Sequence, residues 1–362
     1  AADPVAPGGI DASLTTVNLL NLNDFHGRID DDGTGDLGKA FACTIVTTRA
    51  SLGEGSTALV AAGDNIGASP FTSASQEDLP TIEFLNAVGL RATAVGNHEF
   101  DRGFSDLTGR VDRAADYDQL GANVYERGTT IPAMQEYTVL EIGGLDVGIV
   151  GAVTQDTPTS SPRSVAGLDF GDPVEAVNRV AAQLKDGDAT NGEADIVVAE
   201  YHEGATESDG VTTLQEQIDA GGAFAKIVTD TTAEVDAIFT GHTHKEYAWD
   251  APVPGGEGTR PVLQTGSYAD NLGQLELGYD PATGKVTQYS ATNVPVAAPT
   301  AGCANDPAYT SAARIVDEAV AQAEEVGKQV IGSVSDDITT AHTAARATTA
   351  SASPPSQPHR RH

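Results

Sequence analysis

Side chains that bind divalent metal ions recur in five short segments of this sequence. They are carboxylate, amide and imidazole groups, a mixed set of oxygen and nitrogen donors that suits Mn²⁺, Zn²⁺, Fe²⁺ or Co²⁺ better than a thiolate site would. A structural zinc site needs one closed shell of four ligands, whereas here the set is large enough for two ions. The candidate ligands are Asp24, His26, Asp64, Asn97, His202, His242 and His244.

Each segment taken alone has a plainer interpretation. An Asp-x-His pair such as Asp24 and His26 is usually an incidental feature of a polar loop, and Asp64 after Gly63 reads equally well as a helix cap. His202 by itself would be an ordinary hydrogen-bonded histidine. What favours a site is the joint placement, because five of the eight histidines fall in these segments and the other three lie in the C-terminal tail.

His98 and Asp101 are expected to play a different part from the ligands. His98 directly follows the candidate ligand Asn97, so its side chain points elsewhere and is free to face a substrate. Asp101 stands three residues later, where it can accept a hydrogen bond from the imidazole and orient it. The pair predicts an oriented acid–base group that works without a protein nucleophile.

The candidate residues come directly after apolar runs that we expect to be strands. These runs are Thr16–Leu22, Ala58–Ala62, Ala92–Val95, Asp195–Ala199 and Ala237–Thr240. Further strands are predicted at 145–153, 261–265, 273–279 and 331–338, and helices at 37–50, 81–88, 173–184, 224–231 and 311–330. Strands that alternate with helices indicate an α/β fold with largely buried strands.

Ligands of such sheets bind beyond the carboxyl ends of the strands, so five strand ends at one edge can converge on one site. Residues i and i+2 of an extended segment point the same way. We therefore expect Asp24 and His26 to share one face, and His242 and His244 to do the same.

This series of motifs resembles the signature of the calcineurin-like metallophosphoesterases. Segments 23–27 (NDFHG), 96–101 (GNHEFD) and 241–244 (GHTH) are similar to the 5′-nucleotidase / UDP-sugar hydrolase branch in particular, and the resemblance covers roughly residues 16–300. It implies a four-layer α-β-β-α sandwich with two mixed sheets.

The resemblance also implies a role for each residue and two divalent metal ions as cofactors, whether manganese, zinc, iron, cobalt or magnesium. One ion would be held by Asp24, His26, Asp64 and His244. The second would be held by Asp64, Asn97, His202 and His242, with Asp64 bridging the two. His98 and Asp101 would be the catalytic dyad.

The implied activity is two-metal hydrolysis of phosphate esters, in the first place by a secreted 5′-nucleotidase that releases nucleoside and phosphate. A 2′,3′-cyclic nucleotide phosphodiesterase or a UDP-sugar hydrolase would use the same ligands. A surface protein that binds metal or nucleotide without turnover is an alternative of another class.

The charge of the chain limits its partners. With 52 acidic and 20 basic residues, a net charge of −32 repels nucleic acid polymers and anionic membranes. A small-molecule phosphate ester is therefore the expected partner, and the oligomeric state is left open. Two divalent ions against two ligand carboxylates would still make the pocket locally positive.

The start of the sequence indicates export, because Ala1-Ala2-Asp3-Pro4 is typical of a mature N-terminus after signal-peptide cleavage. The sequence has no apolar run of 18 or more residues, so no membrane span is expected. We expect a secreted, extracellular or cell-envelope protein.

Cys43 and Cys303 form either one disulfide or two buried thiols. The sequence does not distinguish these alternatives, because it does not show whether the two residues are close together.

We divide the chain into an N-terminal lead (1–15), a catalytic domain (16–300), a linker helix (301–330) and a tail (331–362). The end of the tail is rich in Ala, Thr, Ser and Pro and carries no acid after Asp337, which predicts disorder. By the resemblance, this tail is a truncated or aberrant start of a C-terminal nucleotidase domain that recognises the base. Discrimination among nucleotides is accordingly expected to be poor.

Overall fold

The structure is a computed structural model, and it describes residues 2–160 and 163–333. The chain divides into two compact units, Ala1–Glu324 and Glu325–His362. All described strands belong to the first unit, and so do all the residues of the predicted site.

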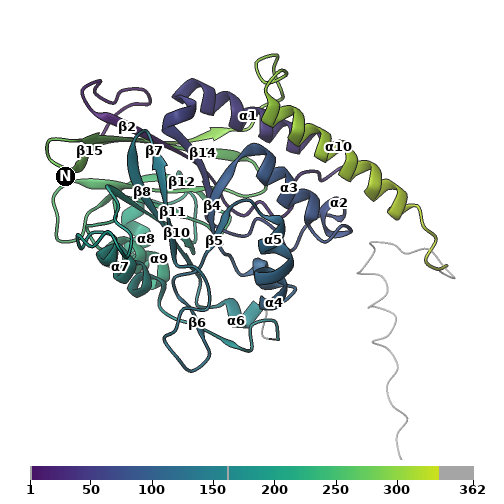
Figure 1. The fold of residues 1–362 in the computed structure, drawn as a ribbon, viewed down its shortest axis with the longest axis horizontal. Helices are drawn as coiled ribbons and strands as arrows, with labels where there is room; N and C mark the ends of the chain where they lie inside the picture. The colour runs from purple at the N-terminus through teal and green to yellow at the C-terminus, as the bar shows by residue number, and fades with distance from the viewer. Residues whose placement is uncertain (1, 161–162, 334–362) are drawn as a thin grey trace, which may run out of the picture. The chain divides into compact units, whose positions relative to one another are not determined.

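Two mixed β-sheets form the centre of the first unit (Figure 1). One sheet has seven strands in the order β1 (Asp3–Pro4), β15 (Lys285–Pro295), β14 (Asn271–Asp280), β2 (Thr15–Leu22), β3 (Thr57–Ala61), β4 (Leu90–Ala94) and β5 (Asp118–Leu120). The other has six, in the order β12 (Glu246–Pro252), β13 (Thr259–Thr265), β11 (Ala237–Thr240), β10 (Ile196–His202), β8 (Leu145–Val153) and β7 (Tyr137–Ile142). A small third sheet pairs β6 (Val124–Glu126) with β9 (Leu168–Phe170).

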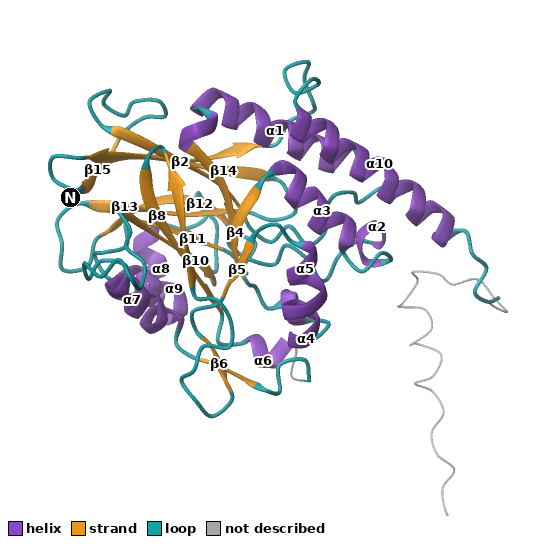
Figure 2. Cartoon of the chain, viewed as in Figure 1, coloured by secondary structure: helices purple, strands orange, loops and turns teal. Residues whose placement is uncertain are grey.

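Helices lie on both sides of the strands (Figure 2). The longer ones are α1 (Asp36–Leu52), α3 (Leu79–Val88), α7 (Pro173–Gln183), α8 (Leu214–Ala220), α9 (Gly222–Asp230) and α10 (Pro307–Gly327). The short ones are α2 (Phe71–Ala74), α4 (Phe104–Asp106), α5 (Asp112–Ala114) and α6 (Thr157–Ser160). Within the described part of the chain, no helix has both the length and the apolar character that a membrane span requires.

Strand β2 shows why the layers form. Val17 and Leu19 lie in the apolar core between the two sheets. Leu20 and Leu22 point the other way, into the core beneath α1 and α3. Because successive side chains of a strand alternate between faces, apolar residues at both odd and even positions bury both faces of the sheet. Each such fully buried side chain contributes about 1.5–3 kcal/mol.

Strand β10 repeats this pattern in the second sheet. Ile196 and Val198 face the core between the sheets, while Val197 and Ala199 pack against α7 and α9. The order of layers is therefore helix, sheet, sheet, helix. The α/β class and the four-layer α-β-β-α sandwich with two mixed sheets are confirmed.

The strands predicted before the site segments are present as β2, β3, β4, β10 and β11. Several predicted boundaries differ from the structure by one to four residues, and one of these differences concerns the site. Strand β10 runs on through His202, which is the last residue of the strand rather than part of the following loop. The predicted N-terminal lead contains a short strand, β1, which pairs with β15. Residues 331–333 form no strand, and the rest of the predicted strand at 331–338 and the predicted disordered tail lie outside the described residues.

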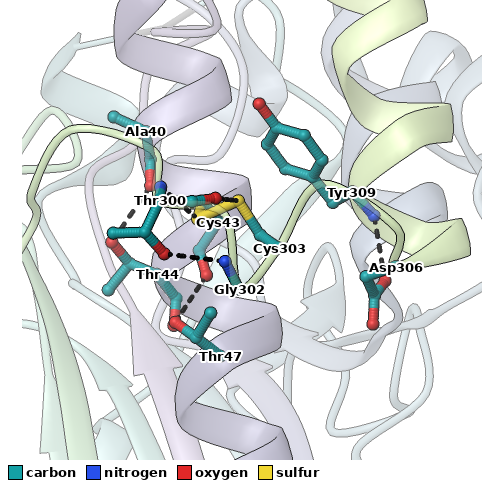
Figure 3. The surroundings of a disulfide bond; sticks show 9 residues. All are labelled: Ala40, Cys43, Thr44, Thr47, Thr300, Gly302, Cys303, Asp306 and Tyr309. Carbon is teal, nitrogen blue, oxygen red and sulfur yellow. Dashed lines mark hydrogen bonds between the residues drawn. A yellow bond between two sulfur atoms is a disulfide. The ribbon is translucent and has the colours of Figure 1, made fainter.

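Cys43 and Cys303 form a disulfide, which settles the choice that the sequence left open (Figure 3). Cys43 lies on α1 and Cys303 in the turn before α10, 260 residues apart in sequence and 5.3 Å apart between Cα atoms. Asp306 then caps α10 by accepting the backbone N–H groups of Ala308 and Tyr309. The bridge joins the start of α10 to α1 at a fixed point.

Candidate metal centre

The polar segments of the sequence meet at one edge of the two sheets. Strands β2, β3 and β4 run parallel in the first sheet, and β10 and β11 run parallel in the second, so within each sheet their carboxyl ends share an edge. The candidate residues stand at those ends: Asp24 and His26 after β2, Asp64 after β3, Asn97 and His98 after β4, His202 at the end of β10, and His242 and His244 after β11.

A first group of possible metal ligands consists of Asp24, His26 and His244, whose ligand atoms all lie within 4.8 Å of one another. Nε2 of His244 is 3.3 Å from Oδ1 of Asp24 and 3.3 Å from Nε2 of His26. Asp24 and His26 are buried, whereas His244 is half-buried and leaves one side of the group open to solvent.

A second group consists of Asp64, His202 and His242, again within 4.8 Å of one another. Nε2 of His202 lies 3.0 Å from Oδ2 of Asp64 and 3.2 Å from Oδ1 of Asn97. The amide of Asn97 therefore belongs to this group as a neutral oxygen donor.

Asp64 lies between the two groups. Its Oδ2 atom faces His202 and is also 3.6 Å from Nε2 of His26 in the first group. Its other oxygen, Oδ1, accepts the backbone N–H of His98 at 2.8 Å, which holds the carboxylate in this orientation. One carboxylate is thus placed to contact two ions.

The hydrogen bonds of the histidines show that a cation fits here. Nδ1 of His26 lies 2.9 Å from the carbonyl of Gly67, and Nδ1 of His202 lies 2.8 Å from the carbonyl of Ala62. A carbonyl can only accept, so both Nδ1 atoms donate, and each neutral ring presents a lone pair on Nε2. These lone pairs face carboxylate and amide oxygens, an arrangement that is repulsive unless a cation lies between them.

The pKa values of His202 and Asp64 also indicate that a positive charge is favourable here. Burial lowers the pKa of His202, but the charge of Asp64 and the hydrogen bond to it outweigh this effect and raise the pKa to about 10. Burial raises the pKa of Asp64, yet the neighbouring histidines, His202 first, hold it well below its usual range. A positive charge between these two side chains is favourable, whether it is a proton or a metal ion.

The backbone at the candidate ligands is strained. Five of the ten described non-glycine residues with positive φ are proposed ligands, namely Asp24, His26, Asp64, His242 and His244, with φ from 48° to 72°. Left-handed backbone is uncommon for such residues, and it concentrates at functional sites where surrounding contacts hold it.

This backbone corrects an expectation from the sequence. The pairs do not lie in extended segments, so the alternation argument for a shared face does not apply to them. Asp24 and His26 still meet in one group, but His242 and His244 separate, one into each group. The division of these two histidines matches the one that the family resemblance implied.

His98 and Asp101 lie beside the two groups, with Nδ1 of His98 2.8 Å from Oδ2 of Asp101. About a third of each side chain is exposed. The hydrogen bond to Asp101 raises the pKa of His98, partial burial lowers it, and the charge of Asp64 raises it further, so the imidazole holds its proton more firmly than usual. A cavity of about 230 Å³ lined by His98 and Asp101 adjoins them.

Sequence reasoning missed Glu99. Its buried carboxylate accepts the backbone N–H groups of Asp64 (2.9 Å), Asn65 (2.7 Å) and Gly96 (2.6 Å), so it ties the loop after β3 to the loop after β4. Burial and the charge of Asp64 raise its pKa to about 7. The available signal was its position, because Glu99 is an acid that directly follows the candidate site residues Asn97 and His98.

Two buried amides organise the remaining loops, and the sequence did not reveal them either. Asn23 donates to Asp24 and to the carbonyl of Gly266, and it accepts the N–H of Thr265. Gln264 donates to the carbonyl of Gly241 and accepts the N–H of Lys245, on either side of the two histidines after β11.

The region of the chain that carries these motifs is similar to known proteins. The family model described as Calcineurin-like phosphoesterase matches residues 18–246. A 5′-nucleotidase of Vibrio cholerae is 28% identical over 262 residues, which cover 70% of this chain and 45% of that protein. Endonuclease YhcR of Bacillus subtilis is 26% identical over 298 residues, 76% of this chain and 23% of that protein.

Among solved structures, the 5′-nucleotidase precursor from Thermus thermophilus superposes with a TM-score of 0.66 at 22% identity, covering 88% of this chain and 61% of that one. This structural similarity supports the four-layer sandwich fold described above. The chain spans at most about half the length of the two curated relatives.

Proposed function

The chain belongs to the calcineurin-like phosphoesterase family, and from this premise we propose that it is a two-metal hydrolase of phosphate monoesters whose substrates are nucleoside 5′-phosphates. The observation that carries the proposal is the pair of ligand groups with Asp64 between them and the His98–Asp101 pair beside them. The similarity to 5′-nucleotidases supports the choice of substrate.

We assign the metal ligands as follows. Asp24, His26 and His244 would hold one divalent ion, Asn97, His202 and His242 would hold the other, and Asp64 would be shared. Two such ions would supply positive charge that neutralises the phosphoryl oxygens and favours attack by water.

The protein's own part is positioning and proton transfer. Asp101 accepts from Nδ1 of His98, which fixes the ring and leaves Nε2 to carry the proton toward the leaving oxygen. Glu99 and Asn23 keep the ligand loops in place before substrate arrives. Because these groups are already oriented, little reorganisation remains for the reaction itself.

The charge of the chain argues for a small substrate. A net charge of −32 opposes a polyanion along its whole length, whereas a single phosphate ester needs only the local positive charge of two ions. The name of endonuclease YhcR indicates a nucleic acid substrate for that relative, but such a substrate is not our proposal for this chain.

Export from the cytoplasm is part of the proposal. The Cys43–Cys303 disulfide supports it, because disulfides persist in oxidising compartments.

A substrate panel tests the function. The purified chain, loaded with Mn²⁺ or Zn²⁺, is assayed for phosphate release from 5′-AMP, p-nitrophenyl phosphate, UDP-glucose and 2′,3′-cyclic AMP, with and without exhaustive chelation. We expect release from 5′-AMP that chelation abolishes and metal restores. Activity that survives chelation contradicts the mechanism. Preference for the cyclic nucleotide or the UDP-sugar shifts the substrate assignment, and metal binding without turnover favours a binding protein.

A further inference from the structure

The hydroxyl of Tyr247 joins the ends of two strands that supply proposed metal ligands. Tyr247 lies on β12 and is 1% exposed. Its Oη atom lies 3.1 Å from the backbone N of Ala205, in the loop after β10, and 2.7 Å from Oγ1 of Thr240, the last residue of β11. Ala205 follows the ligand His202 by three positions. Thr240 precedes the ligand His242 by two positions, so both partners of the phenol are close to a histidine in the sequence.

The groups involved fix the direction of these hydrogen bonds. Oγ1 of Thr240 lies 2.7 Å from the carbonyl oxygen of Leu263, and since a carbonyl can only accept, the threonine uses its one proton there. Tyr247 must then donate to Thr240, and its oxygen accepts the N–H of Ala205. Burial raises the pKa of the Tyr247 phenol, so the phenol keeps this proton at neutral pH. The result is a directed chain of three hydrogen bonds, in which each bond polarises the next.

Packing holds the ring of Tyr247 in place for these bonds. The ring stacks on Trp249, with 4.2 Å between centroids and 7° between planes, and it lies edge-on to Phe224 of α9 at 5.6 Å. Gln264 pairs with Tyr247 across β12 and β13, and its Nε2 atom is 3.5 Å from the hydroxyl, a distance at which a hydrogen bond is weak. Aromatic pairs of this kind contribute about 0.5–1.5 kcal/mol beyond their buried area. The ring therefore holds its hydroxyl at a fixed point.

The loops after β10 and β11 are in direct contact with each other. A Cβ atom added at Gly204 would lie 2.7 Å from the carbonyl oxygen of Gly241 and 2.2 Å from Nε2 of Gln264. The backbone N–H of Gly241 also donates to the carbonyl of Glu203, at 3.4 Å. His242, the next residue, has a φ of +72°, a strained conformation that persists only where surrounding contacts hold it. The position of His242 therefore depends on the loop after β10 as well as on its own strand.

The residues bonded by this hydroxyl flank ligands of the second group. His202 and His242 both belong to that group. The first group is held differently, because two of its members follow β2 in the other sheet. Its third member, His244, precedes Lys245, whose backbone N–H donates to Gln264 at 2.6 Å. The two halves of the metal centre therefore have different supports.

We propose that Tyr247 is a positioning residue for the second ligand group, and that loss of its hydroxyl weakens binding of the ion at that group and not of the other ion. This inference rests on the metal assignment in the proposed function and extends it to a residue outside both ligand groups. The effect passes through Ala205 and Thr240, whose positions set those of the strand ends that carry His202 and His242.

The test compares Tyr247→Phe with Tyr289→Phe, which deletes an equally buried hydroxyl bonded to Thr259 and Asp250 instead. Titration calorimetry with Zn²⁺ measures the affinity of each ion. Anomalous scattering from crystals equilibrated at limiting Zn²⁺ measures the occupancy of each ligand group. We expect Tyr247→Phe to weaken the ion at the second group about 10- to 100-fold, as loss of a ligand's support typically does, and to change the other ion by less than about twofold. Tyr289→Phe should bind both ions as the unmodified chain does.

A second variant tests the same hydrogen bond from its other end. Thr240→Val keeps the shape of the side chain and removes the acceptor of Tyr247, so it should give the same selective loss. The double variant should bind the second ion within about twofold of Tyr247→Phe, because both changes break one bond and their effects are not additive. Additive losses would contradict the connection through Thr240.

Three results would overturn the inference. Equal weakening of both ions in Tyr247→Phe would assign the hydroxyl to the fold as a whole, and weakening at the first group alone would reverse the assignment. Unchanged binding of both ions, with a lower free energy of unfolding, would leave the residue a role in stability only. These measurements need no turnover, so they separate the inference from the proposed function. Two ions bound without hydrolysis would contradict the proposed function and leave the inference standing.

Discussion

Oε2 of Glu99 accepts the backbone N–H of Asp64 at 2.9 Å, so an acid that binds no metal fixes the position of the carboxylate that we assign to both ions. The same side chain also holds Gly96, at the start of the loop that carries Asn97 and His98. One buried carboxylate therefore ties the two loops together.

Replacing Glu99 should loosen the metal centre. Glu99→Gln keeps the size but offers one acceptor oxygen in place of two and turns an NH₂ group toward the backbone donors. We expect metal affinity and kcat to fall about 10- to 100-fold, as partners of metal ligands typically do. Metal content after dialysis and phosphate release measure this, with Glu83→Gln on the exposed face of α3 as the matched control. Full metal content and rate in Glu99→Gln would refute the positioning role.

Replacing His98 should separate catalysis from metal binding. The side chain of His98 lies outside both ligand groups, so His98→Asn should lower kcat by about 10²- to 10⁴-fold while metal content stays within about twofold. The comparison is His202→Asn, which should lose metal and activity together. Parallel loss of metal and rate in His98→Asn would assign the residue a structural role.

The partner of His98 should set a pH limit. Asp101 raises the pKa of His98, and the protonated imidazole is the form that delivers a proton, so activity falls as pH rises through that pKa. Asp101→Asn removes the cause of the rise, and the basic limb of the kcat profile should therefore move to lower pH. The profile is recorded for both proteins with the same metal. An unchanged basic limb means that His98 is not the titrating group.

Arg260 should be structural and not catalytic. Arg260 is 1% exposed, and its guanidinium donates to the carbonyls of Thr231, Thr232 and Val235 in the segment between α9 and β11. Arg260→Met leaves buried carbonyls without donors and should cost about 3 kcal/mol of unfolding free energy. Urea unfolding measures it against Arg314→Met on the surface. Loss of kcat in the folded variant at 25 °C would contradict a purely structural role.

The Cys43–Cys303 bridge should stabilise the unit and leave the chemistry intact. It closes a loop across 260 residues of separation, and removing such a bridge typically costs about 2–5 kcal/mol. Cys43→Ser, Cys303→Ser and the double variant should be destabilised equally, since each removes the same bond. A double variant much less stable than either single one would point to packing of the serines and not to the bridge.

Much of the fold was predictable because it depends on local patterns. Residues 16–22 bury both faces of β2, and the positions of the apolar residues in the sequence predict this. The end of β10 was not predictable, because Glu200 and His202 are polar residues that are usually exposed, yet the surrounding sheets and helices bury both of them in the strand. Neither was the disulfide, since the distance between two cysteines far apart in sequence depends on tertiary packing.

The sequence by itself determined the chemistry available: seven nitrogen and oxygen donors and a histidine–aspartate pair at the ends of five strands, in a chain with a net charge of −32. Tertiary structure decided how the donors divide. His242 and His244 go to different groups because left-handed backbone turns them apart, and Asp64 lies between the groups because Glu99 and the N–H of His98 hold it there.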